Sequence, residues 1–226
     1  MKEDMVFNDD QYQLREYQID IMKRIISNNK YSISDGIVFL GDSIVEAYDI
    51  NKYIPEISNK YNCGIPGFTS ETLLWICDEA VIKYKPLLVY ISIGTNDLGN
   101  TNMRSPRKIA LNIDKLIRLI KGNIENVKIL IVSTTPCDEN RQGPKVGKNL
   151  RTNFNISIVN KEIKKISDRY ENVNFIDIFN EFIDNESGNI KEIYTTDGLH
   201  LTSKGYEKLT DIIKPVLINL YKNLEE

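Results

Sequence analysis

Short runs of β-branched and aromatic residues alternate along this chain with longer segments that carry apolar residues at helical spacing. A strand followed by a helix and a second strand is the repeating unit of a parallel sheet covered by helices. The strand-like runs lie at residues 37–40, 60–62, 87–93, 127–133 and 173–176, and the helical patterns cover about 70–84, 106–121, 149–168 and 203–222. The alternation therefore predicts an α/β fold with a parallel central sheet.

Two of the predicted helices carry clear signals at or near their ends. Ser105 can cap the helix at 106–121, Pro106 suits its first turn, and Gly122 can terminate it. In the last helix, Pro215 lies inside the apolar pattern and removes a backbone donor. We expect Pro215 to kink or shorten that helix.

The chain has 226 residues, which one α/β domain can fill, so we expect a single domain over residues 1–226. An amphipathic helix at about 11–28, with polar Gln18 narrowing its apolar stripe, is expected to pack on the core outside the sheet. The longest irregular stretch, 134–148, is polar and contains several charged residues after Cys137. It is expected to be a loop that borders a site.

Composition excludes several classes of partner. The formal net charge is −3, and no basic patch of the kind that nucleic acid or anionic lipid demands is evident. The sequence contains no apolar run of about 18 residues and no signal-like start, so we expect a soluble, cytoplasmic protein without integral membrane association. Its cysteines, Cys63, Cys77 and Cys137, fit reduced thiols. Nothing in the sequence specifies a homo-oligomer.

Three polar or glycine-containing segments each follow a predicted strand. They are Gly41-Asp42-Ser43, Gly64-Ile65-Pro66-Gly67 and Gly94-Thr95-Asn96-Asp97. Taken singly, they are an ordinary turn, a loop, and an Asx turn or helix cap. In an open parallel sheet, however, ligands bind beyond the carboxyl ends of the strands, so these segments are expected to meet at one site.

The only histidine of the chain, His200, lies three residues after Asp197. Acyl transfer needs a nucleophile, a base, a group that orients the base, and donors for the oxyanion. Ser43 can be the nucleophile, His200 its base and Asp197 the orienting acceptor. The oxyanion donors would be the backbone N–H groups of Ser43 and Gly67 and the side chain of Asn96. The competing interpretation of His200 is a surface histidine beside a helix.

Four segments of the chain resemble the diagnostic blocks of the GDSL, or SGNH, hydrolase family, and they occur in the family's order. They are Phe39-Leu40-Gly41-Asp42-Ser43, Asn62-Cys63-Gly64-Ile65-Pro66-Gly67-Phe68-Thr69-Ser70, Ile93-Gly94-Thr95-Asn96-Asp97 and Tyr194-Thr195-Thr196-Asp197-Gly198-Leu199-His200-Leu201. The details look nearest to bacterial lysophospholipase-like and platelet-activating-factor acetylhydrolase-like esterases.

The resemblance implies a flavodoxin-like three-layer α/β/α sandwich with a central parallel five-stranded sheet. It also implies a catalytic triad of Ser43, Asp197 and His200, with Ser43, Gly67 and Asn96 forming the oxyanion hole. Gly64 competes with Gly67 for the glycine of the second block, and the downstream Thr69 favours Gly67.

Other motifs are weaker. Residues 143–149 imitate a phosphate loop, but the glycine spacing is one residue short and Asn149 replaces the final hydroxyl residue. Residues 184–189 resemble a calcium loop with its glycine misplaced, so a plain turn is expected. The chain has one histidine and no paired cysteine motif, which argues against catalytic zinc. It also lacks a Gly-x-Ser-x-Gly motif, which argues against the α/β-hydrolase architecture.

These observations predict a serine esterase that needs no cofactor or metal and acts on a small-molecule ester. We expect short acyl groups, since no exposed apolar segment suggests a lipid-docking surface. Charged residues at 138, 139, 141, 145 and 148 favour a polar alcohol portion such as a carbohydrate. The alternatives are a lysophospholipase, thioesterase or acyltransferase that uses the same residues, and a flavodoxin-like binding module without turnover.

Overall fold

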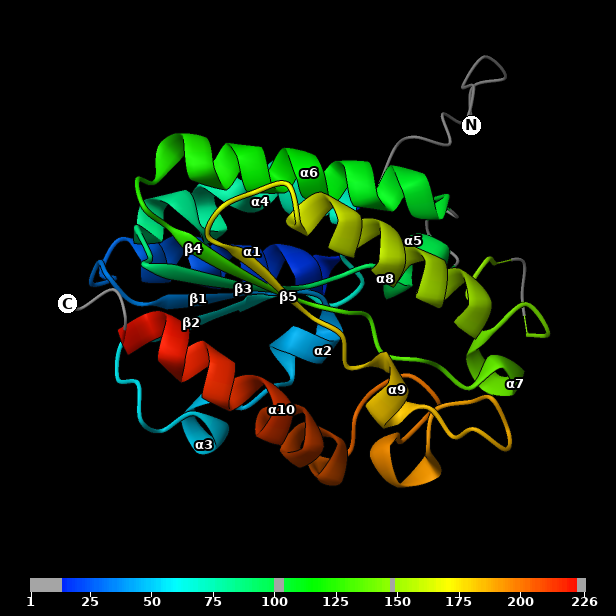
Figure 1. The fold of residues 1–226 in the computed structure, drawn as a ribbon. Helices are drawn as coiled ribbons and strands as arrows, with labels where there is room; N and C mark the ends of the chain where they lie inside the picture. Colours follow the sequence, from blue (N-terminus) through cyan, green and yellow to red (C-terminus); the bar gives the residue numbers. More distant parts are fainter. Residues whose placement is uncertain (1–13, 100–103, 147–148, 223–226) are drawn as a thin grey trace, which may run out of the picture.

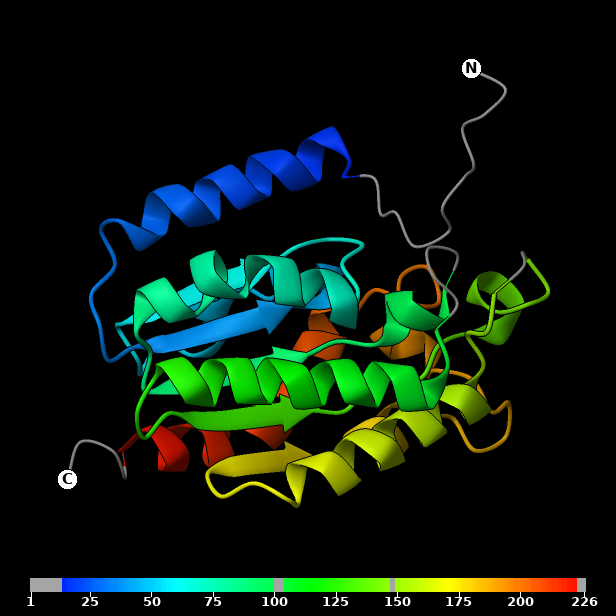
Figure 2. The ribbon, with the colours of Figure 1, turned by 90° about the horizontal axis from the view of Figure 1, so that it is seen from above.

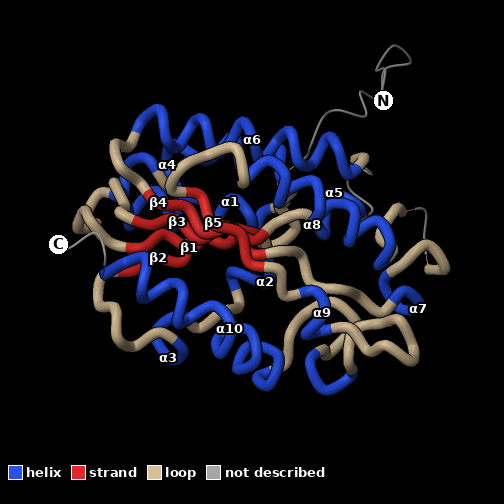
Figure 3. The backbone as a smooth tube through the Cα atoms, viewed as in Figure 1, coloured by secondary structure: helices blue, strands red, loops and turns tan. Residues whose placement is uncertain are grey.

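Five parallel strands form the central sheet of the protein (Figures 1 and 3). The structure is a computed structural model that describes residues 14–99, 104–146 and 149–222. The strands are β1 (Ile37–Gly41), β2 (Lys60–Gly64), β3 (Leu88–Ser92), β4 (Lys128–Val132) and β5 (Val173–Ile176). Their order across the sheet is β2-β1-β3-β4-β5. After β1 the chain adds β2 on one side of the sheet and then β3 on the other, so the strand order reverses between β1 and β3. Open α/β sheets bind ligands at such a reversal.

Helices cover both faces of the sheet, so the predicted three-layer α/β/α fold is confirmed (Figures 1 and 2). One face is covered by α1 (Glu16–Asn29), α4 (Ser70–Ala80), α6 (Pro106–Asn123) and α8 (Asn153–Ser167). The other face is covered by α3 (Ile50–Tyr53), α9 (Phe179–Phe182) and α10 (Ser203–Lys222). The remaining short helices are α2 (Ser43–Glu46), α5 (Thr95–Leu98), α7 (Glu139–Gln142), and two 3₁₀ turns at Ile82–Tyr84 and Glu192–Tyr194.

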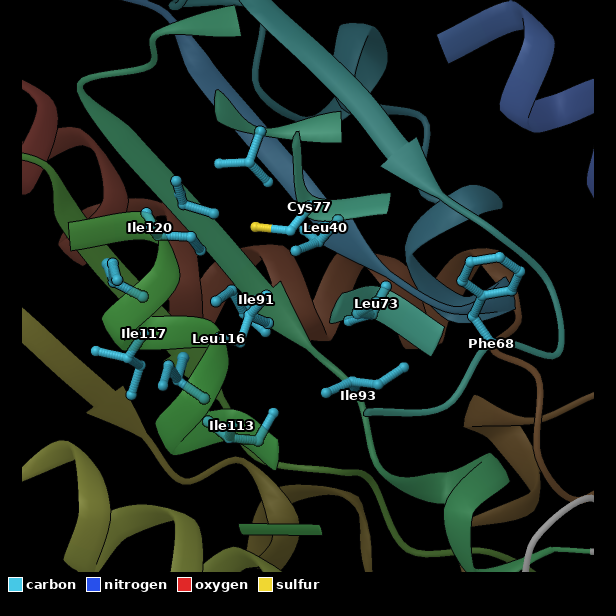
Figure 4. Close-up of a cluster of buried hydrophobic side chains, with 14 of the residues drawn as sticks. Leu40, Phe68, Leu73, Cys77, Ile91, Ile93, Ile113, Leu116, Ile117 and Ile120 are labelled. Atoms are coloured by element: carbon cyan, nitrogen blue, oxygen red, sulfur yellow. The ribbon is translucent and has the colours of Figure 1, made fainter. Parts of the chain in front are cut away.

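The three central strands, β1, β3 and β4, are largely apolar on both faces because both faces are buried. In β1, Val38 and Leu40 point into the core beneath α4 and α6, whereas Ile37 and Phe39 point into the core beneath α10. Figure 4 shows the first of these clusters, in which side chains from β1, β3, α4 and α6 interdigitate. Continuous apolar runs, rather than alternating ones, are what such doubly covered strands require.

All five predicted strands are present, but several helix boundaries differ from the prediction. The pattern at 70–84 forms α4 and then a separate 3₁₀ turn, and the pattern at 149–168 begins as a helix only at Asn153. In α8 the cap is Thr152, whose Oγ1 accepts the Asn155 N–H at 3.1 Å. The predicted terminator Gly122 lies inside α6, which ends at Asn123, so that assignment was wrong.

Pro215 was expected to kink or shorten the last helix, and shortening was wrong, since α10 continues through Pro215 to Lys222. Proline deprives the carbonyl of Asp211 of its donor, and both residues are exposed, so water can replace the missing hydrogen bond. Ile213 and Leu217, on either side, are buried against the sheet and hold both parts of the helix there.

The N-terminal helix α1 packs beside α4, outside the sheet as expected (Figure 2). It begins at Glu16, and residues 11–13 of the predicted helix lie outside the described part of the chain. Within that described part, none of the helices has both the length and the apolar character needed to cross a bilayer. Cys63, Cys77 and Cys137 are all buried free thiols.

Gly64, at the end of β2, offers a test of how tightly the sheet edge is packed. A Cβ atom there would lie 2.2 Å from the backbone nitrogen of Glu46, and backbone cannot move aside as a flexible side chain can. We expect Gly64→Ala to lower the free energy of unfolding by at least about 2 kcal/mol, measured by denaturant titration.

Gly122→Ala is the matched control, because nothing lies within 4 Å of its added methyl group. In a helix this change should leave stability unchanged or raise it by up to about 1 kcal/mol. Equal effects of the two substitutions would contradict the close approach of β2 and α2.

Candidate active site

Ser43 is the first residue of α2 and lies just beyond the carboxyl end of β1. The side chain of Asp42 caps this short helix by accepting the Ile44 N–H at 2.9 Å. Since β1 is hydrogen-bonded to β2 on one side and β3 on the other, Ser43 sits at the reversal in strand order. The turn predicted at Gly41-Asp42-Ser43 is therefore a strand-to-helix junction that presents the serine at the edge where ligands bind.

His200 and Asp197 reach Ser43 from the far end of the chain. The distance from Ser43 Oγ to His200 Nε2 is 2.9 Å, although the two residues are 157 positions apart. The distance from His200 Nδ1 to Asp197 Oδ2 is 2.7 Å. A hydroxyl, an imidazole and a carboxylate joined in this order can move a proton off the hydroxyl and stabilise the resulting imidazolium.

The turn from Thr195 to Leu201 holds the acid and the imidazole in register. The other carboxylate oxygen of Asp197, Oδ1, accepts the backbone N–H groups of Leu199 and His200 at 3.0 and 2.8 Å. The Thr195 hydroxyl donates to the carbonyl of His200 at 3.0 Å and accepts the N–H of Gly198 at 2.9 Å. The three-residue spacing of Asp197 and His200 thus places both on one closed turn.

Asp197 is ionised in this setting. Partial burial acts to raise its pKa, but the hydrogen bonds from the His200 ring and from the backbone of His200 and Leu199 outweigh it, so the pKa lies below its usual value. The Asp197 and His200 side chains are 45% and 41% exposed. The pair therefore faces solvent, and a substrate can reach it.

Gly67 and Asn96 follow the ends of β2 and β3, the two strands that flank β1, and lie close together. The side chain of Asn96 donates through Nδ2 to the carbonyl of Phe68 at 3.0 Å, which places it beside Gly67. Gly67 has φ +78°, a conformation that favours glycine, and it is partly exposed. Gly64 is instead buried against α2, so its role is close packing, and Gly67 is the glycine at the accessible edge.

A buried carboxylate, Asp97, links the loop that carries Gly67 to the helix that carries Asn96. Asp97 has no exposed surface and accepts the backbone N–H of Ser70 at 2.9 Å and its hydroxyl at 2.5 Å. Asn112, on α6, donates to the same hydroxyl at 2.9 Å. Burial raises the pKa of Asp97 to about 7, against the lowering effect of the Ser70 hydrogen bonds, while the charge of Asp42 raises it further.

Gln18 is a second supporting residue whose role was missed. Its side chain is buried and donates to the carbonyl of Pro66 at 2.8 Å, so α1 fastens the loop that carries Gly67. A polar residue interrupting the apolar stripe of an amphipathic helix was the signal available in the sequence.

Arg151 is a third supporting residue, and it gave no signal in the sequence. It is 8% exposed and donates through Nε to the carbonyl of Thr95 at 3.0 Å. Its Nη1 lies 3.5 Å from the backbone and side-chain oxygens of Gln142. Burial lowers the pKa of this guanidinium. Arg151 thereby connects the helix that carries Asn96 to α7.

The predicted loop at 134–148 contains α7 and lies against the Asp197 turn, as expected for a segment bordering a site. Gln142 donates to the carbonyl of Asp197 at 3.0 Å, and the N–H of Asp138 donates to the carbonyl of Gly198 at 2.8 Å. Asp138 is also ion-paired with Arg141 at 2.5 Å. Residues 147 and 148 lie outside the described part of the chain.

The rival motifs have ordinary structural roles where they can be described. Residues 184–189 form a turn in which the N–H of Gly188 donates to the carbonyl of Asp184 at 2.8 Å. Gly143, the first glycine of the phosphate-loop imitation, caps the end of α7. Across the residues that the structure describes, His, Cys, Asp and Glu side chains form no group of three that could hold a metal ion.

Comparison with known families agrees with this geometry. The model of the GDSL-like lipase/acylhydrolase family matches residues 39–208, which include every block discussed above. The chain belongs to this family. Membership makes it a carboxylic ester hydrolase, and the alternative of a binding module without turnover is rejected.

Relatives of this GDSL-family hydrolase include proteins with esterase names. It is 26% identical over 207 residues to a Gallus gallus protein, platelet-activating factor acetylhydrolase IB subunit alpha2, covering 90% of this chain and 84% of that protein. It is 26% identical over 170 residues to the isoamyl acetate-hydrolyzing esterase of Saccharomyces cerevisiae, covering 70% and 68% of the two chains. A GDSL-like lipase structure from Bacteroides thetaiotaomicron superposes with a TM-score of 0.77 at 25% identity, over 88% of this chain and 97% of that one.

Asp97 gives a pH-dependent prediction. Because its pKa is raised in the folded protein, the folded state holds this proton more tightly than the unfolded state does. The free energy of unfolding should therefore fall as pH rises from about 4, the ordinary carboxyl value, to about 7. Asp97→Asn should make the unfolding free energy fall less steeply with pH, as measured by urea titration at several pH values. The pH dependence that remains would come from Asp42, whose pKa is also raised but by less.

Asp211→Asn, at an exposed position on α10, is the control and should leave the pH dependence unchanged. An identical slope in the wild type and in Asp97→Asn would show that the Asp97 proton does not distinguish the folded from the unfolded chain.

Proposed function

We propose that this GDSL-family hydrolase is a serine esterase that works through an acyl-enzyme on Ser43. The hydrogen-bonded chain from Ser43 Oγ through His200 to Asp197, with distances of 2.9 and 2.7 Å, carries this proposal. These residues occur at the positions of the family's motifs, and the chain's only histidine is the one in contact with Ser43.

In the proposed first step, Ser43 Oγ attacks the ester carbonyl carbon while neutral His200 Nε2 takes the hydroxyl proton. The tetrahedral intermediate collapses as the carbon–oxygen bond to the alcohol breaks, and the imidazolium returns the proton to the leaving oxygen. Water then attacks the acyl-enzyme by the same route, with His200 again accepting and returning the proton. Ionised Asp197 stabilises the imidazolium in both steps.

The oxyanion of each intermediate is proposed to accept hydrogen bonds from the backbone N–H groups of Ser43 and Gly67 and from the side chain of Asn96. These residues follow β1, β2 and β3, whose ends are level because Gly41 pairs with both Gly64 and Ser92. The bond from Asn96 to the Phe68 carbonyl uses one of the two amide hydrogens and orients the other. Donors held in this way stabilise charge without reorganisation.

We propose that the substrate is a small-molecule ester with a short, acetyl-type acyl group and a polar alcohol portion. The names of two relatives, the acetylhydrolase subunit and the isoamyl acetate-hydrolyzing esterase, refer to the hydrolysis of acetyl esters. A polar alcohol is supported by the groups that border His200. These include the exposed Asp197 turn and the Asp138–Arg141 ion pair of α7.

Substitution of the proposed nucleophile and base tests the mechanism. Ser43→Ala and His200→Ala should each lower kcat by a similar factor, up to about 10⁶, because members of one acyl-transfer unit act together. A fluorophosphonate probe should label the wild type on Ser43 and fail to label Ser43→Ala. Ser34→Ala, at an exposed position before the amino end of β1, is the control and should retain activity and labelling.

Retention of more than about a tenth of wild-type turnover by folded Ser43→Ala would contradict the acyl-enzyme on this residue. Far-UV circular dichroism and the urea midpoint of each variant separate loss of chemistry from loss of fold.

The acyl preference is tested with p-nitrophenyl esters of increasing chain length. We expect kcat/KM to be highest for acetate and propionate and to fall for octanoate and longer chains. A maximum at long chains would instead favour a lysophospholipase or thioesterase. Adding an acceptor alcohol distinguishes a transferase, since transfer would yield a new ester at the expense of free acid.

A further inference from the structure

A small cavity lined by both polar and apolar residues lies beneath the candidate active site, between the carboxyl ends of β1, β3 and β4. The space open to the centre of a water molecule is about 10 Å³. Its polar lining residues are Asp42, Tyr90, Ser92, Thr95, Thr134 and Thr135. A cavity needs about 10–15 Å³ of such space, and two to four polar partners, to hold one water molecule.

Two hydroxyl groups in this lining have no hydrogen-bond partner among the described residues. Thr95 and Thr135 are 2% and 4% exposed, and the Oγ1 atoms of both are buried and unpaired. Their neighbour Thr134 differs, since its hydroxyl donates to the carbonyl of Ile93 at 3.1 Å. A buried hydroxyl left unpaired costs about 1–3 kcal/mol, so two such groups at one cavity call for a common partner.

The third polar group of the cavity is the carboxyl of Asp42, which is 2% exposed. One of its oxygens accepts the Ile44 N–H at 2.9 Å, and a carboxylate has about four acceptor positions. Burial raises its pKa to about 6, while the Ile44 hydrogen bond and the charges of His200 and Arg151 lower it. The other titratable groups that act on it are Asp97, Tyr90 and Tyr206. Asp42 is therefore largely ionised at pH 7.

We propose that this cavity binds one water molecule, which accepts hydrogen bonds from the Thr95 and Thr135 hydroxyls and donates one to Asp42. Asp42 directly precedes Ser43, whose Oγ lies 2.9 Å from His200 Nε2. The hydrated carboxylate is therefore a positioning group that stabilises the positive charge His200 takes up during the reaction, while Asp197 contacts the ring directly. Three hydrogen bonds are typical of a buried water molecule. The effect on His200 rests on the proposed function, in which that imidazole takes up the serine proton, whereas the water site itself does not.

Replacing threonine with the isosteric valine distinguishes a hydrated cavity from a dry one. If the cavity is dry, Thr135→Val removes an unpaired hydroxyl and leaves the protein equally stable or more stable. If water bridges Thr135 to Asp42, the same change weakens the hydration of the carboxylate and raises its pKa further. A buried acid whose pKa is raised in the folded state makes the protein less stable as pH rises. The stability deficit of Thr135→Val, meaning its loss of unfolding free energy relative to the wild type, should therefore grow above pH 6.

The experiment measures the free energy of unfolding of Thr135→Val and Thr95→Val from pH 5 to 9, in the wild-type and Asp42→Asn backgrounds. In the wild-type background we expect each variant's deficit to increase across about one pH unit above 6 and then level off. In Asp42→Asn, which can still accept the Ile44 N–H, the deficit should not depend on pH. Thr210→Val is the control, since that buried hydroxyl bonds to Tyr48 at 2.7 Å, and its deficit should be independent of pH in both backgrounds.

Turnover of a p-nitrophenyl ester gives the second readout. We expect Thr135→Val to lower kcat about threefold to tenfold at pH 7 with KM unchanged, and to recover at pH 9, where Asp42 is ionised again. In Asp42→Asn, adding Thr135→Val should have no further effect on kcat. A crystal structure of the wild type should show one water molecule within hydrogen-bond distance of all three groups, and a structure of Thr135→Val should show it displaced or lost.

The water site would be overturned if Thr135→Val were as stable as the wild type at every pH. It would also be overturned if the pH-dependent stability deficit persisted in the Asp42→Asn background. A pH-dependent deficit with unchanged kcat would overturn the effect on His200. Loss of all activity in Ser43→Ala is independent of these measurements, so failure of the water site and failure of the proposed function are distinguishable.

Discussion

The candidate active site depends on the parallel pairing of β1 with strands on both sides. This pairing brings three strand ends to one level, and Ser43, Gly67 and Asn96 follow those ends within a few residues. Close approach at Gly41 and Gly64 makes the arrangement possible. An added Cβ would lie 2.3 Å from the Ser92 carbonyl oxygen in the first case and 2.2 Å from the Glu46 nitrogen in the second. Side chains at these positions would push α2, and Ser43 with it, away from the sheet.

The loops beyond the strand ends are fastened to one another by hydrogen bonds between segments. Asn96 bonds to the Phe68 carbonyl, Asp97 to Ser70, and Gln18 to the Pro66 carbonyl. On the other side, Gln142 bonds to the carbonyl of Asp197. A donor aimed at a developing charge stabilises it most when the donor cannot reorient, so these connections matter for the proposed chemistry even though they touch no substrate.

Three aspartates near Ser43 show how environment divides one residue type into different roles. Asp197 is partly exposed and bonded to the His200 ring, and its pKa is lowered. Asp42 and Asp97 are buried, and burial raises the pKa of each, to about 6 and about 7. Asp97 uses its oxygens to join two loops, whereas Asp42 caps α2 and faces the small cavity. Burying two carboxylates beside a site is costly, and each is compensated by backbone donors.

Much of the fold was predictable from the sequence because its signals are local. Short runs of β-branched and aromatic residues marked four of the strands clearly and β2, at Lys60-Tyr61-Asn62, more weakly, and the four sequence blocks marked Ser43, Gly67, Asn96, Asp197 and His200. At Pro215, tertiary packing overrode a local preference: α10 passes through it because buried residues on both sides hold the helix to the sheet. At Gly122 the difference is a single residue, since α6 ends at Asn123.

The sequence by itself determined the α/β alternation, the family and the residue types of the candidate site. Only the tertiary structure decided which long-range partners those residues meet. The 2.9 Å contact across 157 residues, the burial of Gln18 and Arg151, and the cavity shared by Asp42, Thr95 and Thr135 all depend on how β1, β3, β4 and the Asp197 turn come together. Burial and hydrogen-bond geometry are properties of such assemblies, and neither spacing nor composition encodes them locally.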